Sequence, residues 1–130
     1  MADLQLSLIR NWFDKTESGE KTEDYREINE YWFKRLVFDH KKVFKYCTGY
    51  DWDDNIFRKE GIDRITNLKN QMFGFVPFEH NIMTMGYPSK DDLSRILKFK
   101  HAGIEIREGN PDWGAEKGVK YFVIKHGSRV

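Results

Sequence analysis

The segment from Gly19 to Glu27, GEKTEDYRE, places six ionisable side chains, a threonine and a tyrosine in nine residues. If this stretch is extended, alternate side chains share a face, so Asp24 and Arg26 point the same way. With Lys21 they could converge on a concave surface. Such a group can bind a phosphate or a base edge, or let the carboxylate activate water while a cation stabilises an oxyanion. The alternative is a strand-edge ion pair worth at most about 1 kcal/mol.

Other reactive side chains are sparse. Cys47 is the only cysteine and has no neighbouring histidine in the sequence, so we do not expect it to act as a nucleophile. The chain has no CxxC or HxxxH spacing, and we predict neither a metal site nor a cofactor. His80 and His101 are expected to be structural histidines in strands. Asn81 and Asp112 are expected to be turn residues.

The composition favours one globular domain over residues 1–130. Aromatic residues make up 15% of the chain, so rings should supply much of the core volume. The net charge is +1, from 22 basic and 21 acidic residues, so no global field attracts nucleic acid. Two local basic clusters could contact phosphates or could be solvated faces. They are Lys34, Arg35, Lys41, Lys42 and Lys45, and Lys117, Lys120, Lys125 and Arg129.

The apolar segments are short. The stretch before Arg10 is shorter than the apolar core of a signal peptide, and no stretch approaches a membrane span. We therefore expect a soluble, cytoplasmic protein with no membrane partner.

The first third of the chain predicts a strand, a helix, a strand and a helix, which would position the ionisable segment. Leu4, Leu6 and Leu8 alternate with polar residues, as in a half-buried strand. Asn11 should cap a short helix that ends at Gly19, and Asn29 should cap a second helix that continues to Leu36. The ionisable segment lies between these two helices.

The rest of the chain predicts further strands with helices between them. Residues 38–70 are the least regular: YCTGYDWDD is typical of a loop, and Ile62, Ile65, Leu68 and Met72 recur at helical spacing. The remaining expected elements are one or two strands over Phe73–Tyr87, a short helix opened by a capping box of Ser89 and Asp92, a strand containing Ile104 and Ile106, a turn at Pro111 and a strand over Val119–Lys125. This irregular spacing indicates an α+β fold around a mostly antiparallel, barrel-like sheet.

The motif GEKTEDYRE resembles the G-x-K-T-x-x-x-R signature of the ASCH domains in the PUA-like superfamily. Gly19, Lys21, Thr22 and Arg26 carry the match. The segments NWFDKTES, EYWFKRL, MGYPSKDDL and GIEIREGNPDWGAEKGVKYFVIKHG support it, and the last two resemble small stand-alone members in bacteria and phages. The resemblance covers most of the chain except residues 41–71, which could be an insertion.

The resemblance implies a small β-barrel with short helices packed around it and a cleft beside the signature strand. Relatives in the superfamily hold RNA or a single modified base in this cleft. Some ASCH proteins are amidohydrolases that remove an acyl group from acetylated cytidine, and a ribonuclease activity also occurs in the family. The implied partner is therefore RNA or a modified nucleoside, and the choice between binding and catalysis stays open.

One position departs from the amidohydrolase pattern. In that branch the signature lysine acts with a threonine three residues later and a distant glutamate. Lys21 matches the lysine, but Asp24 occupies the threonine position. A carboxylate is a poor nucleophile toward an amide, and it favours the ammonium form of a neighbouring lysine, which cannot act as a base. Hydrolysis with Asp24 as the base and Lys21 or Arg26 stabilising an oxyanion remains possible, and Glu79 and Glu105 are candidates for the distant glutamate.

The binding hypothesis requires fewer conditions than the hydrolytic one. Lys21 and Arg26 would donate to a phosphate or base edge, Thr22 would supply a hydroxyl, and Asp24 would accept from an exocyclic amine. Four aromatic residues are candidates for stacking on bases, or else pack in the core: Tyr31, Trp32, Tyr87 and Trp113. We predict a cleft that binds RNA or a modified nucleoside. The alternatives are a small hydrolase acting on an acylated nucleoside or a ribonuclease, and a protein-interaction or inhibitor module.

Overall fold

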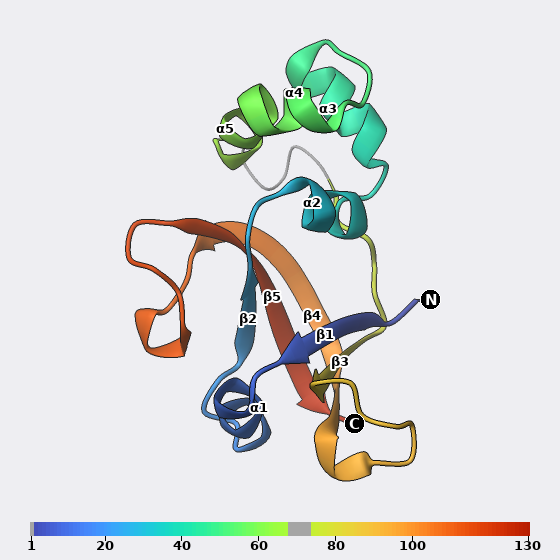
Figure 1. Cartoon of the computed structure of the whole chain (residues 1–130), viewed down its shortest axis with the longest axis vertical. Helices are drawn as coiled ribbons and strands as arrows, with labels where there is room; N and C mark the ends of the chain where they lie inside the picture. The colour runs from blue at the N-terminus through green and yellow to red at the C-terminus, as the bar shows by residue number, and fades with distance from the viewer. Residues whose placement is uncertain (1, 68–73) are drawn as a thin grey trace.

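The computed structural model describes residues 2–67 and 74–130, and its centre is a five-stranded mixed sheet (Figure 1). The strands are β1 (Leu4–Leu8), β2 (Glu23–Arg26), β3 (His80–Met85), β4 (Ile96–Glu108) and β5 (Lys120–Arg129), in the order β1-β3-β4-β5-β2. β1 runs parallel to β3, and the other three pairings are antiparallel. The sheet curls into a half-barrel. The predicted α+β class with a mostly antiparallel, barrel-like sheet is confirmed at this level.

Local sequence explains the strands and the curl of the sheet. In β1 the three leucines are buried and the residues between them are exposed, as their alternation predicts. The long strand β4 changes register against β5 between Phe99 and Ile104, where Gly103 has a φ of 110°. A bulge with a left-handed glycine bends a strand and increases its twist. The bend in β4 therefore helps to bring the two edge strands, β1 and β2, toward each other.

The helices lie at the ends of the half-barrel. They are α1 (Arg10–Glu17), α2 (Glu30–Leu36), α3 (His40–Thr48), α4 (Asp54–Ile56) and α5 (Ile62–Thr66), with a π-helical turn η1 (Phe57–Gly61) between the last two. Two 3₁₀ turns, η3 (Leu93–Arg95) and η4 (Pro111–Trp113), precede β4 and β5. In Figure 1, α2 separates the sheet from the group formed by α3, α4 and α5, and α1 lies at the other end.

Some of the predicted helix starts need correction. Asn29 caps α2 as predicted, because its side chain accepts a hydrogen bond from the Trp32 amide. Asn11 does not cap α1: it lies inside the helix, and Ile9 holds the cap position without a side-chain bond. The capping box at Ser89 and Asp92 opens only the single turn η3, and Asp92 makes no capping bond there. The residues that follow enter β4 because its pairing with β3 takes them into the sheet.

The segment from His40 to Thr66 is mainly helical. The predicted loop at YCTGYDWDD is wrong for its first three residues, which end α3, and for Asp54, which begins α4. Rings hold this part of the chain to α2: Phe33 stacks on Trp52 with ring centroids 5.7 Å apart, and Phe44 contacts Trp52 at 4.9 Å. Ile62 and Ile65 lie in α5 as predicted. Leu68 and Met72 lie outside the described residues. Phe44 and Ile65 belong to the same buried cluster as the sheet leucines, so the core continues through α2.

Two further points complete the fold. The predicted strand region before Tyr87 contains β3 and, at Phe75, an isolated bridge to Val37. Among residues 2–67 and 74–130, every helix is too short or too polar to cross a bilayer.

Candidate functional site

The turn after α1 positions the ionisable segment. Gly19 has a φ of 83°, a conformation that costs glycine little, and it reverses the chain at the end of the helix. The Lys21 amide then donates to the carbonyl of Lys15, 3.0 Å away, which fixes the chain against the last turn of α1. From Glu23 the chain pairs with β5. Lys21 therefore lies between the helix and the edge of the sheet.

Three charged side chains converge at this point. Lys21 Nζ lies 3.0 Å from Asp24 Oδ1, and Arg26 Nε lies 2.8 Å from Asp24 Oδ2. The exposed fractions of the three side chains are 1%, 8% and 19% for Lys21, Asp24 and Arg26. A pair with so little exposure is poorly solvated, so its members depend on each other for stabilisation. Lys21 Nζ also lies 5.8 Å from the ring of Trp12 and 5.7 Å from that of Tyr25, within the range of cation–π attraction.

These side chains line a hollow. We call it the Lys21 cavity; its volume is about 250 Å³. Its lining comes from β1, α1, β2 and η4: Ser7, Leu8, Ile9, Trp12, Lys21, Asp24, Tyr25, Arg26, Trp113 and Gly114. The cation, the acid and the guanidinium thus meet on a concave surface and not on an open exterior. A hollow slightly below the roughly 300–1,000 Å³ range of drug-sized sites suits a ligand as small as one base.

Arg26 joins the two edges of the half-barrel. Its Nη2 donates to the Ser7 carbonyl of β1 at 3.0 Å, and its guanidinium lies 5.0 Å from the ring of Trp32. A larger cavity of about 900 Å³, which we call the Arg35 cavity, is lined mainly by β1 and α2 and includes Trp32. It is lined by Asp3, Leu4, Gln5, Glu30, Tyr31, Trp32, Lys34, Arg35 and Phe78. The guanidinium of Arg35 lies 4.0 Å from the ring of Tyr31.

The sequence-predicted site residues fall into three groups. Lys21, Asp24, Arg26 and Trp113 line the Lys21 cavity. Tyr31 and Trp32 line the Arg35 cavity. Thr22 and Tyr87 line neither: Thr22 is exposed, and its carbonyl accepts from the amide of His126, while Tyr87 is 97% exposed in the loop after β3.

Two of the aromatic lining residues, Trp12 and Tyr25, are not among the site residues predicted from the sequence. The signal for Trp12 was its place in the segment NWFDKTES directly before the motif. Tyr25 is fixed on both sides of its hydroxyl, which donates to Glu23 at 2.7 Å and accepts from the Asn110 amide at 2.9 Å. Burial, with the neighbouring Glu23 carboxylate, raises the pKa of Tyr25 to about 12. The ring is therefore a neutral, immobile wall of the cavity.

A charged network covers the other face of the same strands. Glu23 forms an ion pair with Arg107 of β4, and Arg107 Nε donates to Glu105 at 2.6 Å. The bond from Arg107 lowers the pKa of Glu105. Neither Glu105 nor Glu79, the two candidates for a distant catalytic glutamate, is among the residues that line the Lys21 cavity.

Next to the Lys21–Asp24 pair, the side chains of Asn81, His101 and His126 form a buried hydrogen-bond network. Asn81, predicted as a turn residue, is instead fully buried inside β3 and donates to the Lys125 carbonyl and to His126 Nδ1. Its side-chain oxygen accepts from His101 Nδ1 at 2.7 Å. The prediction failed because cross-strand pairing, which the local sequence does not reveal, satisfies the amide. His101, expected to be a structural histidine, is held by its hydrogen bond to Asn81.

His126 is neutral in this environment. Burial is the main reason that its pKa falls to about 4, with Asp24 raising and Lys21 lowering it. Because Asn81 donates to Nδ1, the neutral ring carries its proton on Nε2. That atom is buried and has no hydrogen-bond partner among the described residues. His126 therefore brings an unsatisfied donor into the region that surrounds the Lys21–Asp24 pair.

Two other groups bear on chemistry. Burial raises the pKa of the Cys47 thiol, which favours the unreactive protonated form.

In the described part of the chain, one group of potential metal ligands converges: Asp3, Glu79 and His80 at the start of β1 and β3. The spacing rules used on the sequence did not reveal this group. Asp112 lies in the turn η4, as predicted.

Comparisons of this chain with protein-family models, with curated proteins and with solved structures gave no match.

Proposed function

We propose that the chain is a PUA-like domain of the ASCH type that binds RNA or a single modified nucleoside in the Lys21 cavity. The observation that supports this is the convergence of Lys21, Asp24 and Arg26 on a hollow that is also lined by aromatic rings. Buried charges beside a cavity are typical of binding and catalytic sites.

The groups in the lining match the features of a nucleobase. The cations present N–H donors, and each oxygen of Asp24 is bonded by only one cation, so lone pairs remain for an exocyclic amine such as that of cytosine. Trp113 is the ring available for stacking, which contributes about 1–3 kcal/mol per base. We therefore expect a base that carries an amino or acylamino group to bind more tightly than one that does not.

The Arg35 cavity extends this proposal from a nucleoside to RNA. Both cavities have lining residues in β1: Ser7 and Leu8 in the Lys21 cavity, and Leu4 and Gln5 in the Arg35 cavity. Lys34 and Arg35 line it together with the acids Asp3 and Glu30, and Tyr31 and Trp32 supply rings. A nucleotide next to the bound base would meet these groups, of which the cations and the rings are the usual components of single-strand recognition.

A hydrolase is the second candidate, and one observation favours it: Ser7 places a hydroxyl-bearing residue in the lining of the Lys21 cavity. Binding is favoured over hydrolysis because Asp24, the available base, already accepts from two cations. Both of its oxygens are therefore already engaged by donors.

The test is a titration of untagged protein with cytidine, N4-acetylcytidine, uridine, adenosine and short single-stranded RNAs. Tryptophan fluorescence would report binding, since Trp12 and Trp113 line the cavity, and chromatography would report product. We expect Lys21→Ala to weaken binding at least about tenfold, since a hydrogen bond to a charged group contributes about 1.5–3 kcal/mol. Lys45→Ala is the matched control, because Lys45 is exposed and pairs only loosely with Asp51, at 3.4 Å.

Each outcome is informative. Binding by a folded Lys21→Ala protein equal to that of the wild type would overturn the proposal. Product formation lost in Lys21→Ala would establish the hydrolase instead. If Lys21→Ala does not fold, Trp113→Leu leaves the ion pair intact and removes the stacking ring, and unchanged binding by that variant would equally count against the cavity.

A further inference from the structure

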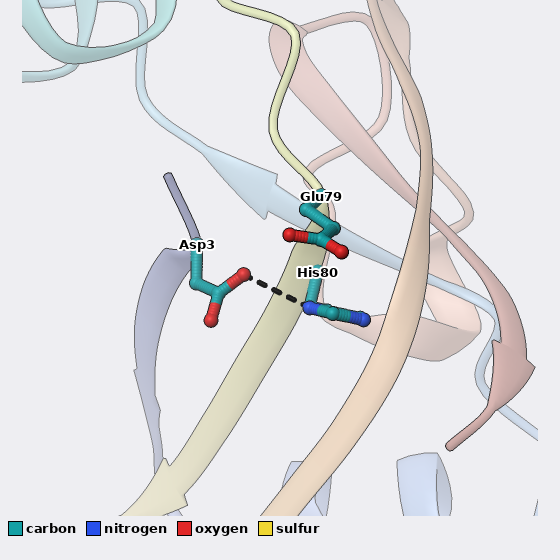
Figure 2. Close-up of side chains that lie close together, drawn as sticks. All are labelled: Asp3, Glu79 and His80. Atoms are coloured by element: carbon teal, nitrogen blue, oxygen red, sulfur yellow. Dashed lines mark hydrogen bonds and ion pairs between the residues drawn. The ribbon is translucent and has the colours of Figure 1, made fainter. Parts of the chain in front are cut away.

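We propose that Asp3, Glu79 and His80 form a binding site for a divalent first-row transition metal such as Zn²⁺. This site is separate from the Lys21 cavity and does not depend on the nucleoside proposal. Figure 2 shows the three side chains together, with the Asp3 carboxylate directed at the imidazole of His80 and the Glu79 carboxylate on the same side of the strand end. One imidazole and two carboxylates are donors that such metals accept.

The sheet holds the backbone of all three residues. β1 pairs in parallel with β3 from Leu4 opposite Asn81, which sets Asp3 beside His80. The Glu79 amide donates to the Ala2 carbonyl at 2.9 Å, and the Glu79 carbonyl accepts from the His101 amide of β4 at 3.1 Å. The group is therefore built on paired strands, and folding of the sheet arranges its backbone before any metal binds.

The distances fit a metal centre. His80 Nδ1 lies 3.0 Å from Asp3 Oδ1. Two ligand atoms each at about 2.1 Å from a metal are about 3.0 Å apart at a right angle and about 3.4 Å apart in a tetrahedron. The pair thus already has the separation that two adjacent ligands need. One ligand atom from each of the three residues lies within 4.8 Å of the others, and Glu79 is exposed, so a side-chain rotation can complete the set.

Charge and burial favour a cation over a simple hydrogen bond. The two carboxylates together would balance a divalent charge, and neutral imidazole adds none. His80 and Asp3 are 17% and 31% exposed, enough for an ion to enter and for water to occupy the remaining coordination positions. Without a metal, the carboxylate of Asp3 accepts a hydrogen bond from Nδ1–H of neutral His80; a metal bound to Nδ1 would take that place, and the ring would carry its proton on Nε2 and stay neutral.

The site borders the Arg35 cavity. Asp3 lines that cavity, as does Phe78, the residue before Glu79. A bound ion would therefore lie beside the larger hollow. The same residues without a metal would do no more than tie the ends of β1 and β3 together, and the experiment must separate the two cases.

The experiment uses untagged full-length protein. Equilibrium dialysis against Zn²⁺ with elemental analysis would give stoichiometry and affinity, and Co²⁺ would report coordination through its visible absorption. We expect one Zn²⁺ per chain, with binding weakened at least about tenfold by Asp3→Asn, Glu79→Gln and His80→Gln. Asp51→Asn and His40→Gln are the matched controls, one exposed acid and one partly exposed histidine away from the site, and should bind as the wild type does.

The outcomes decide between the metal site and a structural tie. Binding of less than one Zn²⁺ per chain, or equal loss in the site and control variants, would overturn the proposal. If the site variants do not fold, NMR of the wild type keeps it testable: paramagnetic broadening by Co²⁺ must centre on residues 3, 79 and 80. Broadening centred elsewhere would refute the assignment.

Discussion

Replacing Asp24 by Asn tests whether the Lys21–Asp24 ion pair is shielded from water. The Asp24 carboxylate accepts from Lys21 at 3.0 Å and from Arg26 at 2.8 Å, and the Lys21 side chain is 1% exposed. Asparagine has the same shape but no charge, so the ammonium would stay inside without a counter-charge. Removing one member of a buried pair costs about 3–5 kcal/mol. Because Arg26 is partly exposed and Asn keeps one acceptor oxygen, we expect the lower end of that range.

The assay is urea unfolding followed by tryptophan fluorescence and circular dichroism. A loss of about 3 kcal/mol corresponds to a melting temperature lower by about 10 °C for a chain of this size. Adding Lys21→Met to Asp24→Asn removes the unpaired ammonium charge and should restore stability to within about 1 kcal/mol of the wild type. Asp51→Asn breaks the exposed pair with Lys45 and should cost less than about 1 kcal/mol.

Two results would refute this reasoning. A loss in Asp24→Asn no larger than in Asp51→Asn would mean that water already solvates the charges around Lys21. A double variant less stable than Asp24→Asn alone would mean that the lysine contributes through packing and not through its charge.

Two further predictions concern residues around the site. Burial lowers the pKa of His126 from 6.5 to about 4, so between these values the unfolded chain takes up a proton that the folded chain does not. This contribution to stability, about 3 kcal/mol, is complete above pH 6.5 and is lost as the pH falls toward 4. In urea unfolding, His126→Gln should therefore lose less stability than the wild type between pH 7 and pH 4. Parallel plots of unfolding free energy against pH for the two proteins would contradict this. Gly109→Ala would place a Cβ 2.7 Å from the Tyr25 ring and should cost about 1–3 kcal/mol. A Cβ at Gly74 meets no atom of the described residues within 4 Å, so Gly74→Ala should change stability by less than about 0.5 kcal/mol. Equal unfolding free energies of the two variants would show that Tyr25 is free to move.

Local patterns predicted the elements that local chemistry determines. The alternation of Leu4, Leu6 and Leu8 indicated β1, and Asn29 indicated the start of α2 through a bond within four residues. The spacing of Lys21, Asp24 and Arg26 indicated that they could meet, because a lysine at the turn and two residues on one face of a strand need no distant partner to do so.

What the sequence could not predict depends on pairing between distant strands. Asn81 looks like a turn residue until β3 is placed between β1 and β4, where its amide bonds His101 and His126. The approach of Asp3 to His80 likewise follows from the parallel pairing of β1 with β3, which no spacing in the sequence encodes. The helices after α2 were difficult to predict because their rings pack on Phe33 and not on an alternating face of their own.

The position of Arg26 links the stability of the half-barrel to its candidate site. β1 and β2 are the two edges of the sheet and do not pair, so a side chain and not a ladder of backbone bonds joins them. The same guanidinium bonds Asp24 inside one cavity and lies over Trp32 beside the other. A ligand that bonds to the Asp24 oxygen held by Arg26 would share that oxygen with the guanidinium. Loss of Arg26 would remove its bond to the Ser7 carbonyl. Arg26 therefore contributes both to the lining of the Lys21 cavity and to the contact between β1 and β2.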